Sequence, residues 1–203
     1  DLQGKITQDN MWDVKARGTT VDGRDFFRSL FSVGQSSDRP QRPQKPRDGV
    51  DIEADIDTLL GFSDTSLKGL KFKLSNRGGR LVSMEAKGTL DGGNPLVAVV
   101  QNQPKEPRRL LADSTDAGRA FKLVGFYPNL QGGRARLEVN LDGKGPAEKT
   151  GILWVDDFII LGDPVVAEVV GSVGAGSTES SVARAKQKVV REAFQFDRMK
   201  APF

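Results

Sequence analysis

The side chains in this sequence best suited to chemistry are carboxylates that occur close together. Four of them occupy every second position of one stretch, as Asp51, Glu53, Asp55 and Asp57. Four carboxylates suggest a calcium site. An EF-hand loop, however, needs a sharp turn and a glycine between its ligands, and the alternating stretch has neither. We therefore interpret these residues as the solvated face of a β-strand, on which side chains alternate between two faces.

A second acidic group, Asp156-Asp157, suggests a hydrolase in which two carboxylates share one substrate. Neighbouring residues on a strand point to opposite faces, so this pair is not expected to act together. The sequence contains no cysteine and no histidine. This excludes thiol nucleophiles, disulfides, Cys/His zinc sites and histidine acid–base catalysis. We expect no catalytic residue, no metal site and no cofactor, and an enzyme is the least favoured hypothesis.

Two stretches of unusual composition are predicted to be loops. Residues 35–49, QSSDRPQRPQKPRDG, hold three prolines and several basic residues, with no large apolar side chain. The stretch has no aromatic residue on which a base could stack, so we expect no nucleic-acid partner. Residues 171–183 are rich in glycine and serine, but their spacing is not a dinucleotide fingerprint and no strand leads into them.

Composition predicts a sheet that is apolar on one face. Of the 203 residues, 37% are hydrophobic, and the formal net charge is +3. The most apolar stretch, Val165–Val170, contains Glu168 and is far shorter than the ~20 residues of a membrane span. The chain begins at Asp1 and stops at Phe203 inside a predicted strand. We expect a single β-rich domain over residues 1–203 that is a piece of a longer protein.

Alternating hydrophobicity predicts most of the secondary structure. Strands are expected over Met11–Val21, Val50–Asp57, Leu70–Leu74, Val82–Leu90, Leu96–Gln101, Arg108–Ala112, Arg134–Leu141, Gly151–Leu161 and Arg191–Phe203. The strand over Gly151–Leu161 is apolar on both faces, with Ile152, Trp154, Phe158 and Ile160 on one and Leu153 and Val155 on the other. The acidic strand from Val50 is expected to lie beside the lysine-bearing strand from Leu70. Short turns between these strands indicate an antiparallel meander.

Three short helices are expected beside this sheet. One follows Asp22 and places four apolar residues at helical spacing. A second covers Ala117–Gly125 with Asp116 as its cap, and Pro128-Asn129 is expected to stop it before Gly132-Gly133 turns the chain. The third begins at Asp163-Pro164 and continues to about Val170. Residues 182–191 form either a short basic helix or a loop. The fold class is therefore mainly β (α+β), with a few helices packed on one face of the sheet.

The order of several short motifs resembles the AsmA-like domain of large Gram-negative envelope proteins, the family related to YhdP and TamB. The matching residues are Asp116-Ala117-Gly118, Gly125-Phe126-Tyr127, Gly132-Gly133, Gly151, Asp157-Phe158, Asp163-Pro164, Phe196-Asp197 and Ala201-Pro202-Phe203. The resemblance covers residues 113–203 well and residues 50–112 in general character, and it carries no catalytic motif. It implies a C-terminal piece of such a protein, built as a curved, mostly antiparallel sheet.

The resemblance also implies a location and a function. The parent protein would be anchored in the inner membrane through parts outside this sequence and would project into the periplasm. The apolar concave face of the sheet would form a groove that conducts phospholipids and supports outer-membrane integrity. The predicted lining is Ile52, Ile56, Phe72, Leu74, Met84, Leu137, Val139 and Leu141. Two alternatives stay open: these residues form an ordinary core under the helices, or the domain is a structural module that binds partners by strand addition at a sheet edge. The oligomeric state is not predicted.

Overall fold

The computed structural model describes residues 2–6, 11–31, 49–104, 106–142, 150–174 and 193–203. The described strands are β1 (Leu2–Ile6), β2 (Met11–Asp22), β3 (Gly49–Leu60), β4 (Ser66–Arg77), β5 (Arg80–Leu90), β6 (Pro95–Gln101), β7 (Arg109–Ser114), β8 (Leu130–Asn140), β9 (Gly151–Leu161) and β10 (Ala193–Pro202). The helices are α1 (Arg24–Phe31), α2 (Ala117–Val124) and α3 (Pro164–Gly174). The mainly β fold class predicted from the sequence is confirmed.

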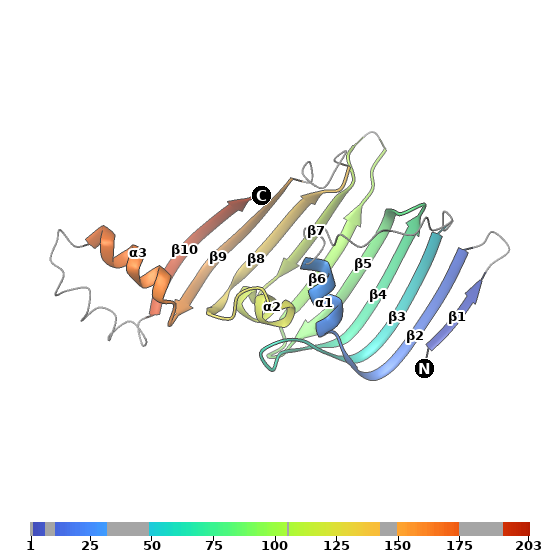
Figure 1. The fold of residues 1–203 in the computed structure, drawn as a ribbon, viewed down its shortest axis with the longest axis horizontal. Helices are drawn as coiled ribbons and strands as arrows, with labels where there is room; N and C mark the ends of the chain where they lie inside the picture. Colours follow the sequence, from blue (N-terminus) through green and yellow to red (C-terminus); the bar gives the residue numbers. More distant parts are fainter. Residues whose placement is uncertain (1, 7–10, 32–48, 105, 143–149, 175–192) are drawn as a thin grey trace, which may run out of the picture.

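The strands form one open sheet in which spatial order follows chain order from β1 to β10 (Figure 1). Every neighbouring pair is antiparallel except β2 and β3, which are parallel. A parallel pair needs a connection that returns the chain to the same end of the sheet. Here α1 lies in that connection, so one helix is built into the meander by the topology itself.

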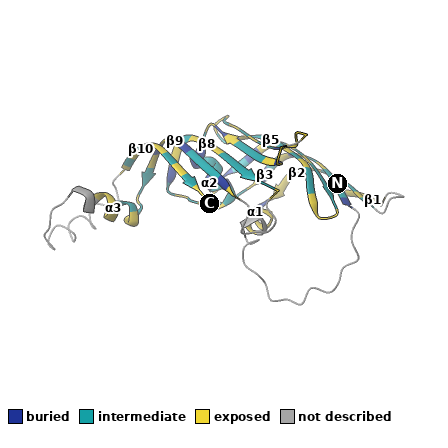
Figure 2. Ribbon diagram, turned by 90° about the horizontal axis from the view of Figure 1, so that it is seen from above, coloured by how far each residue is buried: buried dark blue, intermediate teal, exposed yellow. Residues whose placement is uncertain are grey.

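All three helices lie at the same end of the strands (Figure 1). α1 follows the last residues of β2, α2 joins the end of β7 to the start of β8, and α3 follows the end of β9. The sheet is curved, and α1 and α2 lie on its concave side (Figure 2). The concave face is therefore covered by helix at one end of the strands.

Two hydrophobic clusters attach these helices to the sheet. The first joins α1 and α2 to the sheet through Phe27, Ile56, Leu59, Leu67, Leu90 and Leu123. The second joins α2 to the later strands through Ala117, Phe121, Leu130, Ala135, Val155 and Phe158. Because α2 contributes residues to both clusters, it is the element that ties the two halves of the sheet to one another. Leu123 is only 1% exposed and is among the most deeply buried of the large side chains described.

The ends of α2 follow from local sequence. The Asp116 carboxylate accepts a hydrogen bond from the backbone N–H of Arg119 at 2.9 Å, which confirms it as the N-cap. Gly125 ends the helix in the left-handed conformation, with φ of 72°. The helix predicted over Ala117–Gly125 is therefore one residue too long, because Gly125 is its C-cap, and Pro128 lies beyond its end. Gly118 lies against β8 so closely that a Cβ atom there would be 2.6 Å from the carbonyl oxygen of Leu130.

The prediction that Gly132-Gly133 turns the chain is wrong. Both glycines lie inside β8, with φ of 62° and 77°. Gly132 pairs with Phe158 and Arg134 pairs with Asp156. Gly133, between them, therefore lies opposite Asp157, whose own φ is 54°. Both strands are therefore bent at the same level, because positive φ values interrupt the pleat without changing the register.

This bend also corrects the predicted faces of β9. Val155 and Phe158, placed on opposite faces by strict alternation, are both buried in the second cluster. The distortion at Asp157 reverses the alternation for the rest of the strand, which a period of two cannot anticipate. The predicted loop over residues 35–49 is one residue too long, because Gly49 begins β3. The predicted loop over residues 171–183 starts too early, because α3 continues to Gly174. Residues 35–48, 175–183 and 184–191 lie outside the described residues.

Candidate functional site

A row of apolar residues crosses the sheet, and from β2 to β10 it lies on the concave side. Cross-strand partners follow one another from strand to strand without a gap in the register. We call this set the alanine row: Leu2, Ala16, Ala54, Phe72, Ala86, Ala98, Ala112, Leu137, Leu153 and Ala201. Ala54 borders the first hydrophobic cluster and Leu153 borders the second, which places the row on the face that carries α1 and α2.

The alanine row differs from the clusters in how far it is covered. From Ala16 to Ala201 its members are half-buried, whereas the cluster residues beneath the helices are buried. In the part of the chain that the structure describes, α1 and α2 therefore cover one end of the strands, beside this row, but do not cover the row itself. Because the side chains of its alanines are small, the surface along the row is lower than over the larger side chains on either side. We call this lower strip the floor of the row; it runs across the strands, along the length of the sheet.

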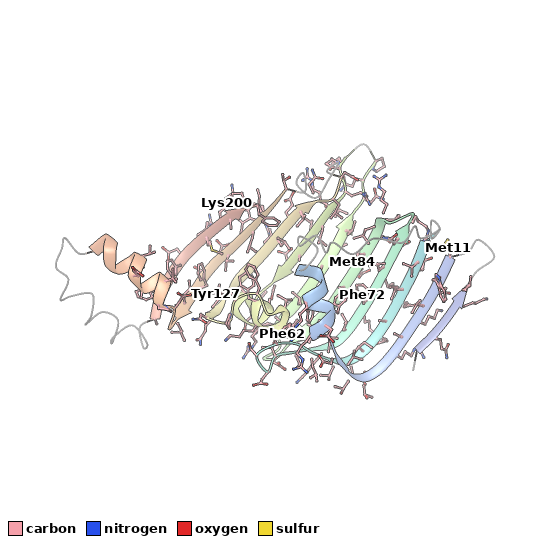
Figure 3. The ribbon with its side chains drawn as sticks, viewed as in Figure 1. Met11, Phe62, Phe72, Met84, Tyr127 and Lys200 are labelled. Atoms are coloured by element: carbon pink, nitrogen blue, oxygen red, sulfur yellow. The ribbon has the colours of Figure 1, made fainter. Side chains whose placement is uncertain are left out.

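A second row of larger side chains lies on the same face, further from the helices. Val14, Ile52, Leu74 and Met84 are successive cross-strand partners on β2 to β5, and Val100, Leu110 and Val139 are partners on β6 to β8. Except for Val100, which is buried, these residues are half-buried. Figure 3 shows Phe72 and Met84 on the neighbouring strands β4 and β5. The two rows together form a continuous apolar surface.

The residues predicted to line a groove fall in four places. Ile52, Phe72, Leu74 and Met84 gather on β3 to β5, and Leu137 and Val139 lie on β8. The alanines and aliphatic residues of β6 and β7 connect these two groups. Leu141 follows the end of β8, where its backbone N–H donates to the carbonyl oxygen of Arg108 at 2.9 Å. Ile56 is 5% exposed and packs in the first cluster under the helices, so it belongs to the core.

Sequence reasoning missed the alanines as a group. Ala86, Ala98 and Ala112 are consecutive partners at the centre of the row, on three adjacent strands. Alanine carries little hydrophobic weight, so strand patterns single out the larger residues beside it. A signal was available in the repeated placement of one alanine near the middle of several alternating strands. Only the register shows that these positions align.

The opposite, convex face of β2 to β5 carries paired charges. Lys71 Nζ lies 2.8 Å from Asp55 Oδ2, Lys73 Nζ lies 3.1 Å from Glu53 Oε1, and Arg77 Nη2 lies 2.8 Å from Asp51 Oδ2. Hydrogen bonds from these cations lower the pKa of each carboxyl group. The predicted pairing of the acidic strand with the lysine-bearing strand is therefore observed. Because the side chains of the two lysine pairs are more than half exposed and those of Arg77 and Asp51 about 40% exposed, these contacts add little to stability.

Two hollows lie on this charged face. One, of about 250 Å³, is lined by residues that include Lys15, Arg17, Glu53, Asp55 and Lys71. The other, of about 400 Å³, shares Lys15, Glu53 and Lys73 with it. Lysine, arginine and carboxylate side chains alternate along their walls, so neither hollow concentrates one sign of charge. Among the described residues no group of three or more acidic side chains has the geometry to hold a metal ion.

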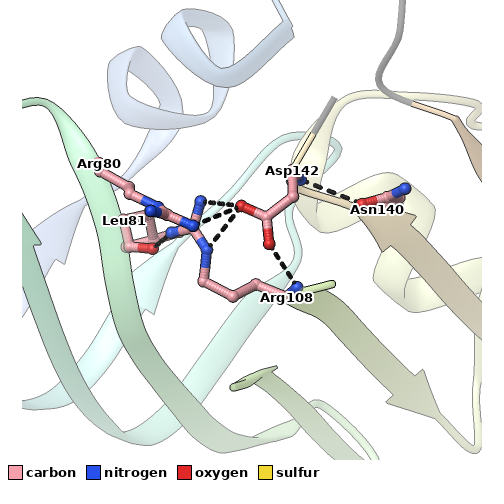
Figure 4. A network of polar contacts seen from close by, with 5 residues as sticks. All are labelled: Arg80, Leu81, Arg108, Asn140 and Asp142. Atoms are coloured by element: carbon pink, nitrogen blue, oxygen red, sulfur yellow. Dashed lines mark hydrogen bonds and ion pairs between the residues drawn. The ribbon is translucent and has the colours of Figure 1, made fainter. Parts of the chain in front are cut away.

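A polar network fixes the end of the sheet opposite the helices (Figure 4). Arg108, which is 7% exposed, contacts Asp142 through its Nη2 at 2.6 Å and its Nε at 3.0 Å, and its Nη1 donates to the carbonyl oxygen of Leu81. Arg80 Nη2 adds a contact of 2.8 Å to Asp142. The hydrogen bonds from Arg108 hold the pKa of Asp142 well below its usual value. This network joins β5 to the ends of β7 and β8 and so holds the central strands together.

A second polar contact positions α3. The Tyr127 hydroxyl donates a hydrogen bond to Asp163 Oδ2, and Asp163 Oδ1 accepts from the backbone N–H groups of Val165 and Val166 at 2.8 and 3.1 Å. Asp163 is therefore the N-cap of α3, as predicted. Burial and the neighbouring carboxylate together raise the pKa of Tyr127, while the hydrogen bond from Tyr127 lowers that of Asp163. This contact links the start of α3 to the turn between α2 and β8.

The candidate acidic pair on β9 does not follow the strict alternation assumed from the sequence, because Val155 before it and Phe158 after it are both buried in the second cluster. Asp156 Oδ1 accepts a hydrogen bond from Arg198 Nε on β10 at 2.6 Å. The hydrogen bond to Asp156, and also the charge of Asp157 at the bend, raise the pKa of the Arg198 guanidinium. Both carboxylates therefore act on the same arginine, and the opposite-face argument made from the sequence does not hold for this pair.

The class of protein that these features define is an open, curved and mostly antiparallel β-sheet with a continuous apolar surface on its concave side. No protein-family model, no curated protein and no solved structure matches the chain. None of the helices in the described ranges is long and apolar enough to cross a membrane.

Proposed function

We propose that this chain is a non-enzymatic segment of a periplasmic envelope protein and conducts phospholipids or other acyl-chain ligands along its concave face. The observation that carries the proposal is the alanine row, which runs from one edge strand to the other. An apolar surface that extends past its helices is suited to acyl chains, because burial of each methylene group contributes ~0.8 kcal/mol. The resemblance to the AsmA-like domain supports the same function.

The dimensions of the row suit this ligand. Neighbouring strands lie about 4.8 Å apart, so a row across ten strands is roughly 43 Å long. One leaflet of a bilayer hydrocarbon core is about 15 Å thick, which is the reach of one acyl chain. An acyl chain lying along the row would therefore contact about three or four strands, and the next strands would present the same surface. A ligand could move along such a row without meeting a charged side chain on this face.

Substitution of Ala98 tests the proposal, because this residue lies at the centre of the row on β6. Ala98→Glu places a charge on the floor, and Ala98→Phe fills the floor without adding charge. Val99→Glu, on the opposite face of the same strand, is the matched control. Native mass spectrometry of the purified chain measures how much phospholipid accompanies it. We expect lipid on the unmodified chain and on Val99→Glu, with at least a tenfold loss in both Ala98 variants.

Two results would overturn the proposal. One is repeated absence of lipid from the unmodified chain, and the other is equal lipid on the Ala98 variants and the control. Thermal unfolding of each variant shows whether a loss of lipid reflects a loss of the fold. Ala98→Phe keeps the test valid if Ala98→Glu does not fold.

We propose that the parent protein is anchored in the inner membrane of a Gram-negative bacterium through parts outside this sequence. Cell fractionation of the parent protein, with protease added to spheroplasts, tests this location. Protection of this segment from protease in spheroplasts, with digestion only after lysis, would contradict a periplasmic location.

A second candidate function is a structural module in outer-membrane biogenesis that recruits partners at a sheet edge. The observation that favours it is the open sheet, in which β1 and β10 each have one neighbouring strand in the described part of the chain. Strand addition at such an edge joins backbone groups and needs no pocket. Arg198→Pro on β10 would weaken strand addition, because its backbone N–H points away from β9, whereas the Ala98 variants would leave strand addition intact. The two candidate functions therefore respond to different substitutions.

A further inference from the structure

The helix α3 presents an exposed apolar surface at the β10 end of the sheet. Val165, Val169 and Val170 are 67%, 57% and 40% exposed, and we call these three residues the valine patch. Ala167, on the same helix, is 5% exposed and attaches it to the molecule. Short helices that are apolar around most of their circumference are normally buried. The exposure of the valine patch therefore indicates that α3 contacts another apolar surface when the protein functions.

The position of the valine patch is fixed by polar contacts. Asp163 caps the helix and is hydrogen-bonded to Tyr127, so the start of α3 is held against the turn after α2. In that turn Phe126 is 58% exposed, although its ring also contacts Phe121. From this anchored start α3 projects past the edge of the sheet, on the side of β10 (Figures 1 and 2). The helix therefore lies at the end of β9, whereas the alanine row leaves the sheet at Ala201, which pairs with Leu153 near the start of β9.

We propose that α3 docks this end of the molecule on the surface of a phospholipid bilayer, with the valine patch inserted among the acyl chains. The helix has eleven residues and is about 16 Å long, roughly half the thickness of the hydrocarbon core. It would lie in the interface of the bilayer, as apolar helix faces of peripheral proteins do. Ligand on the alanine row is not required for this docking.

Two properties favour a bilayer over a protein partner. A partner that binds a helix in a groove reads a single stripe of side chains, and Val165 and Val170 lie on different sides of α3. Burying three valine side chains removes on the order of 300 Å² of surface, far below the ~800 Å² per subunit of a stable dimer. A bilayer imposes neither a register nor a minimum area.

The docking can be tested by flotation of the whole chain with vesicles of phosphatidylcholine, which carry no net charge. Glu168 is the only charged residue of α3, so binding should change little between low and high salt. The variant Val165→Ser/Val169→Ser should reduce partition into the vesicles at least tenfold. Val97→Ser is the matched control, because Val97 is a 41% exposed valine on β6, away from α3. This control should float as the unmodified chain does.

Insertion itself can be observed with Val169→Trp, whose added indole should shift its emission to the blue when vesicles are added. The proposal is overturned if the chain does not float, if both variants float equally, or if binding needs anionic lipid and disappears in salt. It is also overturned if the serine variant instead abolishes a dimer. Flotation of a chain that carries no lipid on the alanine row would support this docking while contradicting the proposed function.

Discussion

Leu123→Ala is the substitution that most directly tests how α2 is held on the sheet. Leu123 is 1% exposed and packs with Phe27, Leu59 and Leu67, residues that come from α1, β3 and β4. Truncating a leucine in such a site removes its burial and leaves a cavity, at a cost of about 2–5 kcal/mol. Leu123 also accepts a hydrogen bond through its carbonyl oxygen from the N–H of Phe62 at 3.1 Å, and the substitution leaves this contact in place.

We expect the free energy of unfolding to fall by about 3 kcal/mol, near the middle of that range. For a chain of this size each kcal/mol corresponds to roughly 2–4 °C, so the melting temperature should fall by roughly 6–12 °C. Urea unfolding followed by circular dichroism measures the same change, with a shift of the midpoint by about 1–1.5 M if the slope is 2–3 kcal/mol per M. Near-ultraviolet spectra would show whether the remaining core keeps its packing.

Val124→Ala is the matched control for this measurement. Val124 is the next residue of the same helix and borders the same cluster, but it is only half-buried. Its truncation removes less surface, and alanine favours the helix more than valine does, so we expect a loss below about 1 kcal/mol. If Leu123→Ala cost no more than Val124→Ala, the account of α2 as a helix anchored through Leu123 would be refuted.

Three further predictions use other contacts. Gly118→Ala should lower stability by about 1–3 kcal/mol, because its Cβ would meet the backbone of β8, whereas Gly4→Ala, which meets nothing within 4 Å, should be neutral in the same thermal unfolding assay. Asp142→Asn should destabilise the chain at pH 7. Because folding depresses the pKa of Asp142, its carboxylate stabilises the fold at pH values above its ordinary pKa of 3.8, and this stabilisation is lost as pH falls through the folded pKa. The difference in urea midpoint between Asp142→Asn and the unmodified chain should therefore narrow in acid. The single tyrosine, Tyr127, should ionise above its ordinary pKa of 10.0 in an absorbance titration, and Asp163→Asn should bring that pKa down; no difference between the two chains would contradict the contact.

Much of the fold follows from local patterns. Alternation identified the long strands, and Asp116 and Asp163 marked the starts of two helices because a carboxylate at the N-cap accepts from free backbone N–H groups. The placement of charges on one face of β3 and β4 was also local, since it depends only on the period of the strand. β1 was the element missed, because its five residues contain too few alternating positions to stand out.

The errors arose where the backbone departs from a regular period. Gly132-Gly133 looked like a turn because adjacent glycines usually end a strand, yet here they lie opposite the bend at Asp157 and allow β8 to continue. The faces of β9 changed for the same reason. In both cases the conformation of one strand is set by its neighbour.

The sequence by itself determined that one face of this sheet is apolar and the other charged, because each strand carries that information in its own alternation. Tertiary structure decided which residues on the apolar face share a row, since Ala16 and Ala54, or Ala112 and Leu137, become partners only through the register of separate strands. It also decided that Ile56 is core while Phe72 lies in the half-buried row, because α1 and α2 cover only one end of the strands. Coverage by another element is a long-range property. No pattern within a strand encodes it.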